Sequence, residues 1–164
     1  MFSYKLTVAY DGTNYNGFQR QKNGVGVQQV LEKALSKLLQ DEINLQAAGR
    51  TDAGVHAMGQ VVSFSTQTKF PAEALPKALE HLLPDDIVVV KGEAVKEEFH
   101  ARYDAKEKTY QYRIVLAQRP NPCLQHYAWQ LNADLDIEKM QQAADLLLGT
   151  HDFSTFRNSG SANK

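Results

Sequence analysis

Apolar and polar residues alternate at the start of the chain, between residues 4 and 10. Successive side chains of a strand point to opposite faces, so this alternation predicts a half-buried strand. Between residues 27 and 39 the apolar positions instead recur every three or four residues, which predicts an amphipathic helix. The same spacing returns between residues 137 and 148, and Gly149 is expected to end that helix. The buried face of the first strand is predicted to carry Tyr4, Leu6, Val8 and Tyr10.

Shorter patterns predict the remaining elements. A second helix is expected to begin near Pro71 and to run to about Leu83, because proline suits a first helical turn and Pro84 stops the helix. Further strands are expected at 43–48, at 60–65, at 87–91 as a buried strand, and at 108–116, with Tyr110 and Tyr112 on one face.

The predicted elements follow the order strand, helix, strand, strand, helix, strand, and a further strand and helix come after them. This is the order of ferredoxin-like (split β-α-β) folds, followed by the beginning of a second unit. We therefore predict an α+β fold of ferredoxin-like units around a mixed, mainly antiparallel sheet. Residues 1–104 are expected to form an N-terminal half. Residues 105–164 are expected to begin a second half that is truncated, because no strand pair follows to cover its helix.

Composition narrows the classes of function. The single cysteine, Cys123, cannot form an intrachain disulfide, and the sequence has no Cys/His cluster for zinc, so we expect a protein of the reducing cytoplasm without a metal. No apolar run approaches the length of a membrane span, and the first residues do not resemble a signal peptide. The net charge is −1, so binding to a nucleic acid would require basic groups gathered at one place.

The run from Gly49 to His56, Gly-Arg-Thr-Asp-Ala-Gly-Val-His, is the strongest candidate for chemistry. It places one carboxylate, Asp52, in a glycine-bracketed loop between two predicted strands, two residues after Arg50. Glycines let a ligand approach the backbone closely, and loops between strands often carry catalytic groups. The plain alternative is an aspartate that stabilises its own turn, with Arg50 as a solvated partner.

Three further segments interleave aromatic side chains with cations and amides, at residues 10–21, 99–105 and 108–113. Aromatic rings stack on bases, and arginine and amide groups bind phosphates or base edges. The alternative for the aromatic rings is packing on the core. Residues 24–27 match neither a dinucleotide-binding fingerprint nor a phosphate-binding loop, so we predict no nucleotide cofactor.

Together and in this order, these segments resemble the tRNA pseudouridine synthase A family. The resemblance rests on the Tyr-Asp-Gly loop with its Gln-x-Gln, on GRTDAGVHA at 49–57, on F-x-A-R at 99–102, on K-x-Y-x-Y at 108–112, and on His151-Asp152-Phe153 with Phe156. It spans the whole chain, but only the first part of a typical member. It implies a pseudouridine synthase fold and isomerisation of uridine to pseudouridine in the anticodon stem-loop of tRNA, at positions 38 to 40. It also implies a homodimer that needs neither metal nor cofactor.

The resemblance also implies roles for particular residues. Asp52 would be the catalytic carboxylate, which attacks C1′ or C6 as a nucleophile or takes a proton from C2′; the sequence does not choose among these routes. Arg50 would orient and ionise Asp52, and could replace the flipped base in the helix. Tyr110 would stack on the uracil and could move a proton. Contacts to RNA are expected from residues beside the matched motifs: Arg20, His56, His100, Arg102 and Arg157.

Other classes of protein remain open at this stage. An RNA-binding module without chemistry would use aromatic residues of its sheet, but no RNP-type pattern is visible. A non-catalytic fragment of such an enzyme would keep the motifs and lack turnover. A glycoside hydrolase would need two carboxylates facing one bond, and only Asp52 lies in such a loop.

Overall fold

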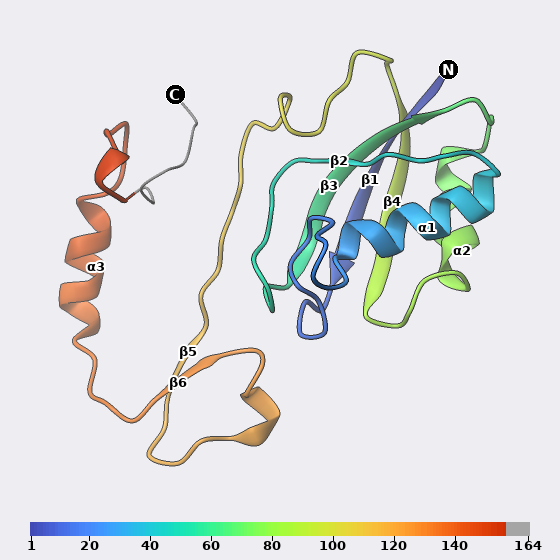
Figure 1. Cartoon of the computed structure of the whole chain (residues 1–164). Coiled ribbons are helices and arrows are strands. Elements are labelled where there is room, and N and C mark those ends of the chain that lie inside the picture. Colours follow the sequence, from blue (N-terminus) through green and yellow to red (C-terminus); the bar gives the residue numbers. More distant parts are fainter. Residues whose placement is uncertain (157–164) are drawn as a thin grey trace. The chain divides into compact units, whose positions relative to one another are not determined.

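The chain forms two compact units, Met1–Gln111 and Tyr112–Lys164, in a computed structural model that describes residues 1–156. The first unit contains four strands and two α-helices (Figure 1). In chain order these are β1 (Phe2–Tyr10), α1 (Val27–Leu39), β2 (Gln46–Ala47), β3 (Ala57–Thr66), the 3₁₀ turn η1 (Ala72–Ala74), α2 (Leu75–Glu80) and β4 (Ile87–Val95).

The strands of the first unit form one antiparallel sheet in the order β2-β3-β1-β4. The register places Tyr10, the last residue of β1, opposite Ala57 at the start of β3 and opposite Ile87 at the start of β4. The segments that follow β1, precede β3 and precede β4 therefore meet at the same end of the sheet.

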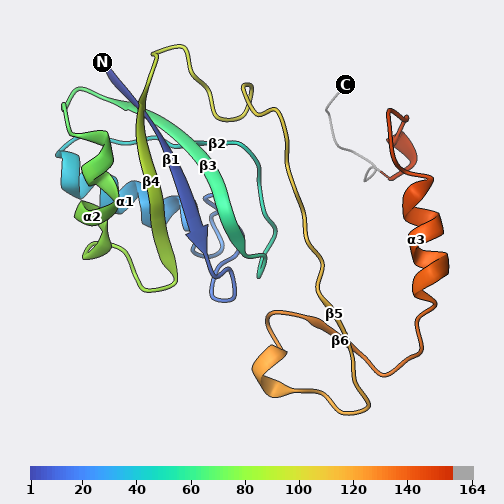
Figure 2. The same ribbon diagram turned by 180° about the vertical axis from the view of Figure 1, so that it is seen from behind.

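Both α-helices cover one face of this sheet. Helix α1 passes in front of the strands in Figure 1 and behind them in Figure 2, and its buried side includes Leu31 and Leu35. Helix α2 packs on the same face, because Gly92 of β4 lies opposite the buried Leu6, and a methyl group added to Gly92 would lie 3.3 Å from Cβ of Leu75, the first residue of α2. Burial of apolar side chains between the helices and this face is the main source of stability.

Several predictions are confirmed in the first unit. The alternating segment 4–10 lies within β1, and the four residues predicted for its buried face are all buried. The amphipathic segment 27–39 is α1, and the predicted strand 60–65 lies within β3. The α+β class with an antiparallel sheet is also confirmed.

Other predicted boundaries are wrong. Of the predicted strand 43–48 only Gln46–Ala47 pairs with a neighbour, and the second helix ends at Glu80 rather than near Leu83. The strand predicted at 87–91 extends to Val95, and it is not buried on both faces. It lies at the edge of the sheet, with Val88 and Val90 more than half exposed on the face opposite the helices.

The second unit has little regular structure in its described part. Strands β5 (Ile114–Leu116) and β6 (Trp129–Leu131) pair in parallel, and they are followed by α3 (Ile137–Asp145). Short 3₁₀ turns lie at Pro122–Leu124 (η2) and Ser154–Phe156 (η3). Between residues 112 and 156 no side chain is buried. None of the helices in residues 1–156 is long and apolar enough to cross a membrane.

The predicted strand 108–116 is wrong for its first six residues, since only Ile114–Leu116 pairs with another strand. The alternation of Tyr110 and Tyr112 therefore does not reflect a half-buried strand, and both rings are exposed. The third predicted helix ends at Asp145, and Gly149, with φ of 104°, follows it in the left-handed region.

Candidate functional site

Asp52 lies in the loop of residues 48–56, called the Asp52 loop below, which enters β3. The loop turns where the Val55 amide donates to the Asp52 carbonyl oxygen at 3.2 Å and Gly54 adopts a φ of 78°. The side chain of Asp52 is exposed, and it has no hydrogen bond or ion pair with any residue in 1–156. A carboxylate that stabilises its own turn, the plain alternative from the sequence, is therefore not seen.

Arg50 is also exposed, and within residues 1–156 it forms no ion pair with Asp52. The expected orientation of the carboxylate by this guanidinium is therefore absent from the free protein. The charge of Arg50 lies two residues from Asp52 in a solvated loop, where screening by water weakens the attraction between the two groups.

The backbone of the Asp52 loop is fixed by its neighbours instead. The Tyr10 hydroxyl shares a hydrogen bond of 2.9 Å with Thr51 Oγ1, and Gln60 Nε2 donates to the Gly49 carbonyl oxygen at 2.7 Å. Burial raises the pKa of the Tyr10 hydroxyl, hydrogen bonds to Thr51 and Gln60 act in the opposite direction, and Tyr110 raises it further. Tyr10 therefore stays protonated at neutral pH as a hydrogen-bonding partner of the loop.

Tyr110 lies in the segment that follows the sheet. It also raises the pKa of the Tyr10 hydroxyl, which bonds to Thr51. A methyl group added to Gly49 would lie 3.5 Å from Lys108 Nζ, so this segment runs beside the Asp52 loop. The ring of Tyr110 is 67% exposed, which leaves it accessible to a ligand. The structure thus places the segment that carries Tyr110 beside the Asp52 loop.

His56 closes the Asp52 loop against a second loop, residues 11–18, called the support loop below. His56 Nδ1 lies 3.0 Å from Asp11 Oδ1, and the Gly12 amide lies 3.2 Å from the same nitrogen. One ring nitrogen cannot donate and accept at once, so Nδ1 binds Asp11 when it carries a proton and Gly12 when it does not. His56 therefore has protein partners at one ring nitrogen, and its expected contact with RNA stays a prediction.

The other expected RNA contacts are placed in different surroundings. Arg20 pairs with Glu32, whose carboxylate is buried in α1. Arg102 is exposed, with its guanidinium 5.7 Å from the centre of the Tyr103 ring. Arg157 lies outside the described residues.

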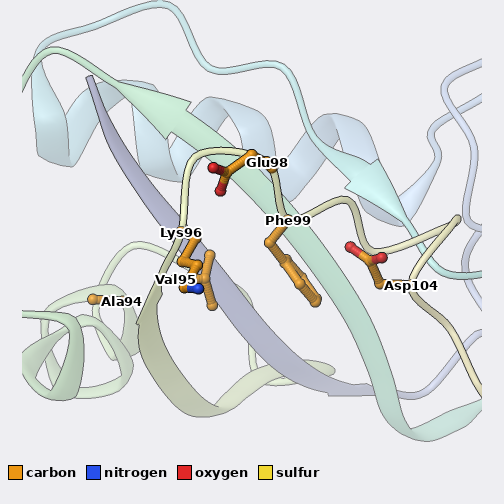
Figure 3. A pocket seen from close by; sticks show the side chains of 6 residues that line it. All are labelled: Ala94, Val95, Lys96, Glu98, Phe99 and Asp104. Carbon is orange, nitrogen blue, oxygen red and sulfur yellow. The ribbon is translucent and has the colours of Figure 1, made fainter.

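The segment that carries Arg102 folds over the sheet face opposite the helices. The Ala101 amide donates to Ser63 Oγ at 3.0 Å, and Lys5 Nζ lies 6.0 Å from the centre of the Phe99 ring. Figure 3 shows Phe99 beside a shallow hollow at the end of β4, which is lined by Ala94, Val95, Lys96, Glu98, Phe99 and Asp104. Because Val95 is at the end of β4 remote from Ile87, this hollow is separate from the Asp52 loop.

Tyr10, Asp11 and Tyr15 lie in the segment 10–21 that the sequence singled out, but their support of the Asp52 loop was not predicted. Nothing local in the sequence points to Asp86, which the strand order brings to the same end of the sheet. No group of three or more His, Cys, Asp or Glu side chains suited to a metal ion occurs in residues 1–156.

Comparison with known proteins gives one consistent family. The model of a family described as tRNA pseudouridine synthase matches residues 6–104. The chain is similar to a tRNA pseudouridine synthase A of Thermoanaerobacter sp. strain X514, with 52% identity over 162 residues, which are 99% of this chain and 66% of the relative. Identity is 48% with that of Acetivibrio thermocellus, over 100% of this chain and 67% of the relative. It is 50% with that of Paramagnetospirillum magneticum, over 95% of this chain and 61% of the relative.

Proposed function

This chain belongs to the tRNA pseudouridine synthase family, and we propose that it isomerises uridine to pseudouridine in tRNA with Asp52 as the catalytic carboxylate. The substrate would be the anticodon stem-loop, at positions 38 to 40. The chain spans 66% of the length of the first relative it matches, so activity of these 164 residues alone is part of the proposal.

The observation that supports this proposal best is the state of Asp52. Its carboxylate is exposed and has no partner in residues 1–156, while the backbone on both sides of it is held by hydrogen bonds. A nucleophile or base works from a fixed position, and it need not first break an internal bond when the substrate arrives. The nearby exposed ring of Tyr110 offers a surface for a flipped uracil.

The reaction breaks the N1–C1′ bond of uridine, joins C1′ to C5, and releases the proton from C5. Ionised Asp52 would attack C1′ or C6, or would take a proton from C2′; each route needs the carboxylate at the reacting sugar or base. Tyr110 would stack on the uracil and could move a proton through its hydroxyl. Arg50, which is not paired with Asp52 in residues 1–156, would be available to fill the place of the extruded base.

The remaining parts of the proposal concern binding and assembly. Arg20, His56, Arg102 and Arg157 would contact RNA, and two copies of the protein would bind one tRNA as a homodimer. The strand order β2-β3-β1-β4 with both helices on one face supports a ferredoxin-like N-terminal half, residues 1–104, that carries the Asp52 loop. Residues 105–164 would then begin the second half.

The test is release of tritium from C5 of uridine in a tRNA transcript labelled at that carbon. We expect release by the chain and none by Asp52→Asn, which keeps the shape of the side chain and removes its charge. Asp134→Asn, at an exposed aspartate of the second unit, is the control and should release tritium normally.

Release that survives Asp52→Asn would contradict the assignment of Asp52. A chain that binds the same tRNA in a gel shift but releases no tritium would instead support the alternative, a non-catalytic RNA-binding module.

A further inference from the structure

The support loop contacts the Asp52 loop through its backbone on both sides of Asp52. The Phe18 amide donates to the Thr51 carbonyl oxygen at 3.0 Å, and the Gly54 amide donates to the Tyr15 carbonyl oxygen at 3.3 Å. These two hydrogen bonds bracket Asp52, so any movement of the support loop would move the backbone that carries the carboxylate.

Two glycines of the support loop make this close approach possible. A methyl group added to Gly12 would lie 2.1 Å from the Val55 carbonyl oxygen, and one added to Gly17 would lie 2.5 Å from the Thr51 carbonyl oxygen. Gly17 also has a φ of 86°, which other residues rarely adopt. The two loops are therefore in direct backbone contact, with no side chain between them at these positions.

The support loop is anchored on two sides. The Gln28 amide of α1 donates to the Phe18 carbonyl oxygen at 2.8 Å, and on the other side the loop contacts Asp86, in the turn before β4. The Tyr15 hydroxyl donates to Asp86 Oδ1, and Asn14 Nδ2 lies 3.4 Å from Asp86 Oδ2. The Asp11 amide donates to the Asp86 carbonyl oxygen at 2.9 Å. Tyr15 is only 8% exposed, so its ring is packed in the core. Burial and the neighbouring Asp86 carboxylate both raise the pKa of Tyr15, which keeps the hydroxyl protonated as a donor.

We propose that Asp86, acting through Tyr15 and the support loop, is a positioning residue that fixes the backbone of residues 51–54 and with it the carboxylate of Asp52. The importance of this positioning for turnover rests on the proposed function, in which Asp52 is the catalytic carboxylate. Asp86 and Tyr15 would not act on the substrate. They would hold Asp52 in its reactive position. This matters because a displacement of a catalytic group by about 1 Å can lower the rate by as much as 10²-fold.

The first experiment measures hydrogen exchange of the Phe18 and Gly54 amides in the full 164-residue chain. Tyr15→Phe should speed exchange at these two amides about tenfold, because it removes the side-chain bond between the support loop and Asp86. The matched control is Tyr4→Phe, at another buried tyrosine whose hydroxyl donates to the Phe70 carbonyl oxygen at 2.9 Å. Tyr4 lies toward the other end of β1, so its variant should leave both amides unchanged. Equal exchange rates in the two variants would overturn the proposal.

The second experiment measures kcat and KM for tritium release. Tyr15→Phe and Asp86→Ala should each lower kcat about tenfold with little change in KM for tRNA, since they displace Asp52 without touching bound RNA. Asp86→Asn keeps an acceptor oxygen for the Tyr15 hydroxyl and should restore most of the rate. A kcat for Tyr15→Phe equal to that of Tyr4→Phe, or a loss shared between kcat and KM in Asp86→Ala, would contradict the positioning role.

The two experiments separate failure of this proposal from failure of the proposed function. Exchange rates decide whether Asp86 and Tyr15 fix the loop, and they need no turnover. Tritium release that survives Asp52→Asn would refute the role of Asp52 in catalysis, and with it any effect of positioning on kcat, while the exchange result would still hold or fail by itself.

Discussion

Asp52 is held in place through its backbone rather than through its own side chain. Thr51 is bonded through both its carbonyl oxygen and its hydroxyl, and the Gly54 amide is bonded to the support loop. Exposed loop residues usually lose much conformational freedom when a substrate orders them. In the Asp52 loop part of this conformational entropy is already lost on folding. Binding of a substrate would therefore cost less entropy in placing the carboxylate for its proposed role.

The ring and the hydroxyl of Tyr110 have separate roles in the proposed function, and single substitutions can distinguish them. Tyr110→Phe keeps the ring, so KM should be unchanged, and kcat should fall about 10²-fold if the hydroxyl moves a proton. Tyr110→Ala also removes the stacking surface and should raise KM at least about tenfold. Steady-state kinetics of tritium release measures both.

Tyr112 offers a control for this comparison, since its ring is 89% exposed and lies two residues further along. Tyr112→Ala should have little effect on either constant. Normal turnover by Tyr110→Phe would limit Tyr110 to stacking. Equal effects of the two alanine variants would remove Tyr110 from the site.

At the scale of elements, helix α1 is tied to its neighbours by a buried carboxylate. Glu32 is 4% exposed, and its Oε1 accepts from the Leu45 amide at 3.0 Å and from Gln28 Nε2 at 2.9 Å. Its second oxygen pairs with Arg20. A buried carboxylate needs such partners, because removing it from water is otherwise costly. Arg20 therefore links the segment between β1 and α1 to α1 itself, and through Glu32 to Leu45, just before β2.

This arrangement predicts that Arg20 contributes to stability whether or not it binds RNA. Arg20→Ala should lower the free energy of unfolding by about 1 kcal/mol, a modest loss because the arginine is more than half exposed and screened by water. Lys22→Ala, at an exposed neighbouring cation, should change it by less than about 0.5 kcal/mol.

Urea unfolding followed by far-ultraviolet circular dichroism gives both values. If the two variants are equally stable, the ion pair between Arg20 and Glu32 does not contribute to the free energy of unfolding. A defect in tRNA binding by Arg20→Ala could then be attributed to a direct contact.

At the scale of the whole molecule, the buried residues are distributed unequally. In residues 1–156 every buried side chain belongs to Met1–Gln111, where the sheet and both helices share one core. The second unit leaves apolar residues of α3 exposed, among them Ile137 and Met140. An amphipathic helix gains most of its stability from packing its apolar face, and α3 lacks that contribution in the described structure.

We therefore expect residues 1–111 to fold by themselves. A chain ended after Gln111 should keep the urea midpoint of the full chain and a single cooperative transition, whereas the isolated peptide 112–164 should show no cooperative unfolding. Circular dichroism against urea concentration measures both. A clearly lower midpoint for the shorter chain would show that the second unit stabilises the first.

Local patterns in the sequence were sufficient for the elements whose structure depends on their own residues. The spacing of apolar residues predicted β1 and α1, because side-chain direction follows from the geometry of a single strand or helix. The local pattern gave a wrong prediction at 108–113. The alternation around Tyr110 is that of a strand, but no neighbouring strand pairs with these residues. A strand exists only when another strand accepts its hydrogen bonds.

The family resemblance, the α+β class and the candidate residues Asp52, Arg50 and Tyr110 all follow from the sequence alone. The support of the Asp52 loop follows only from the fold, since Tyr15 and Asp86 meet at one end of the sheet through the antiparallel order of β1, β3 and β4. Such pairing depends on contacts between residues far apart in the chain, which leave no periodic trace in the sequence around either partner.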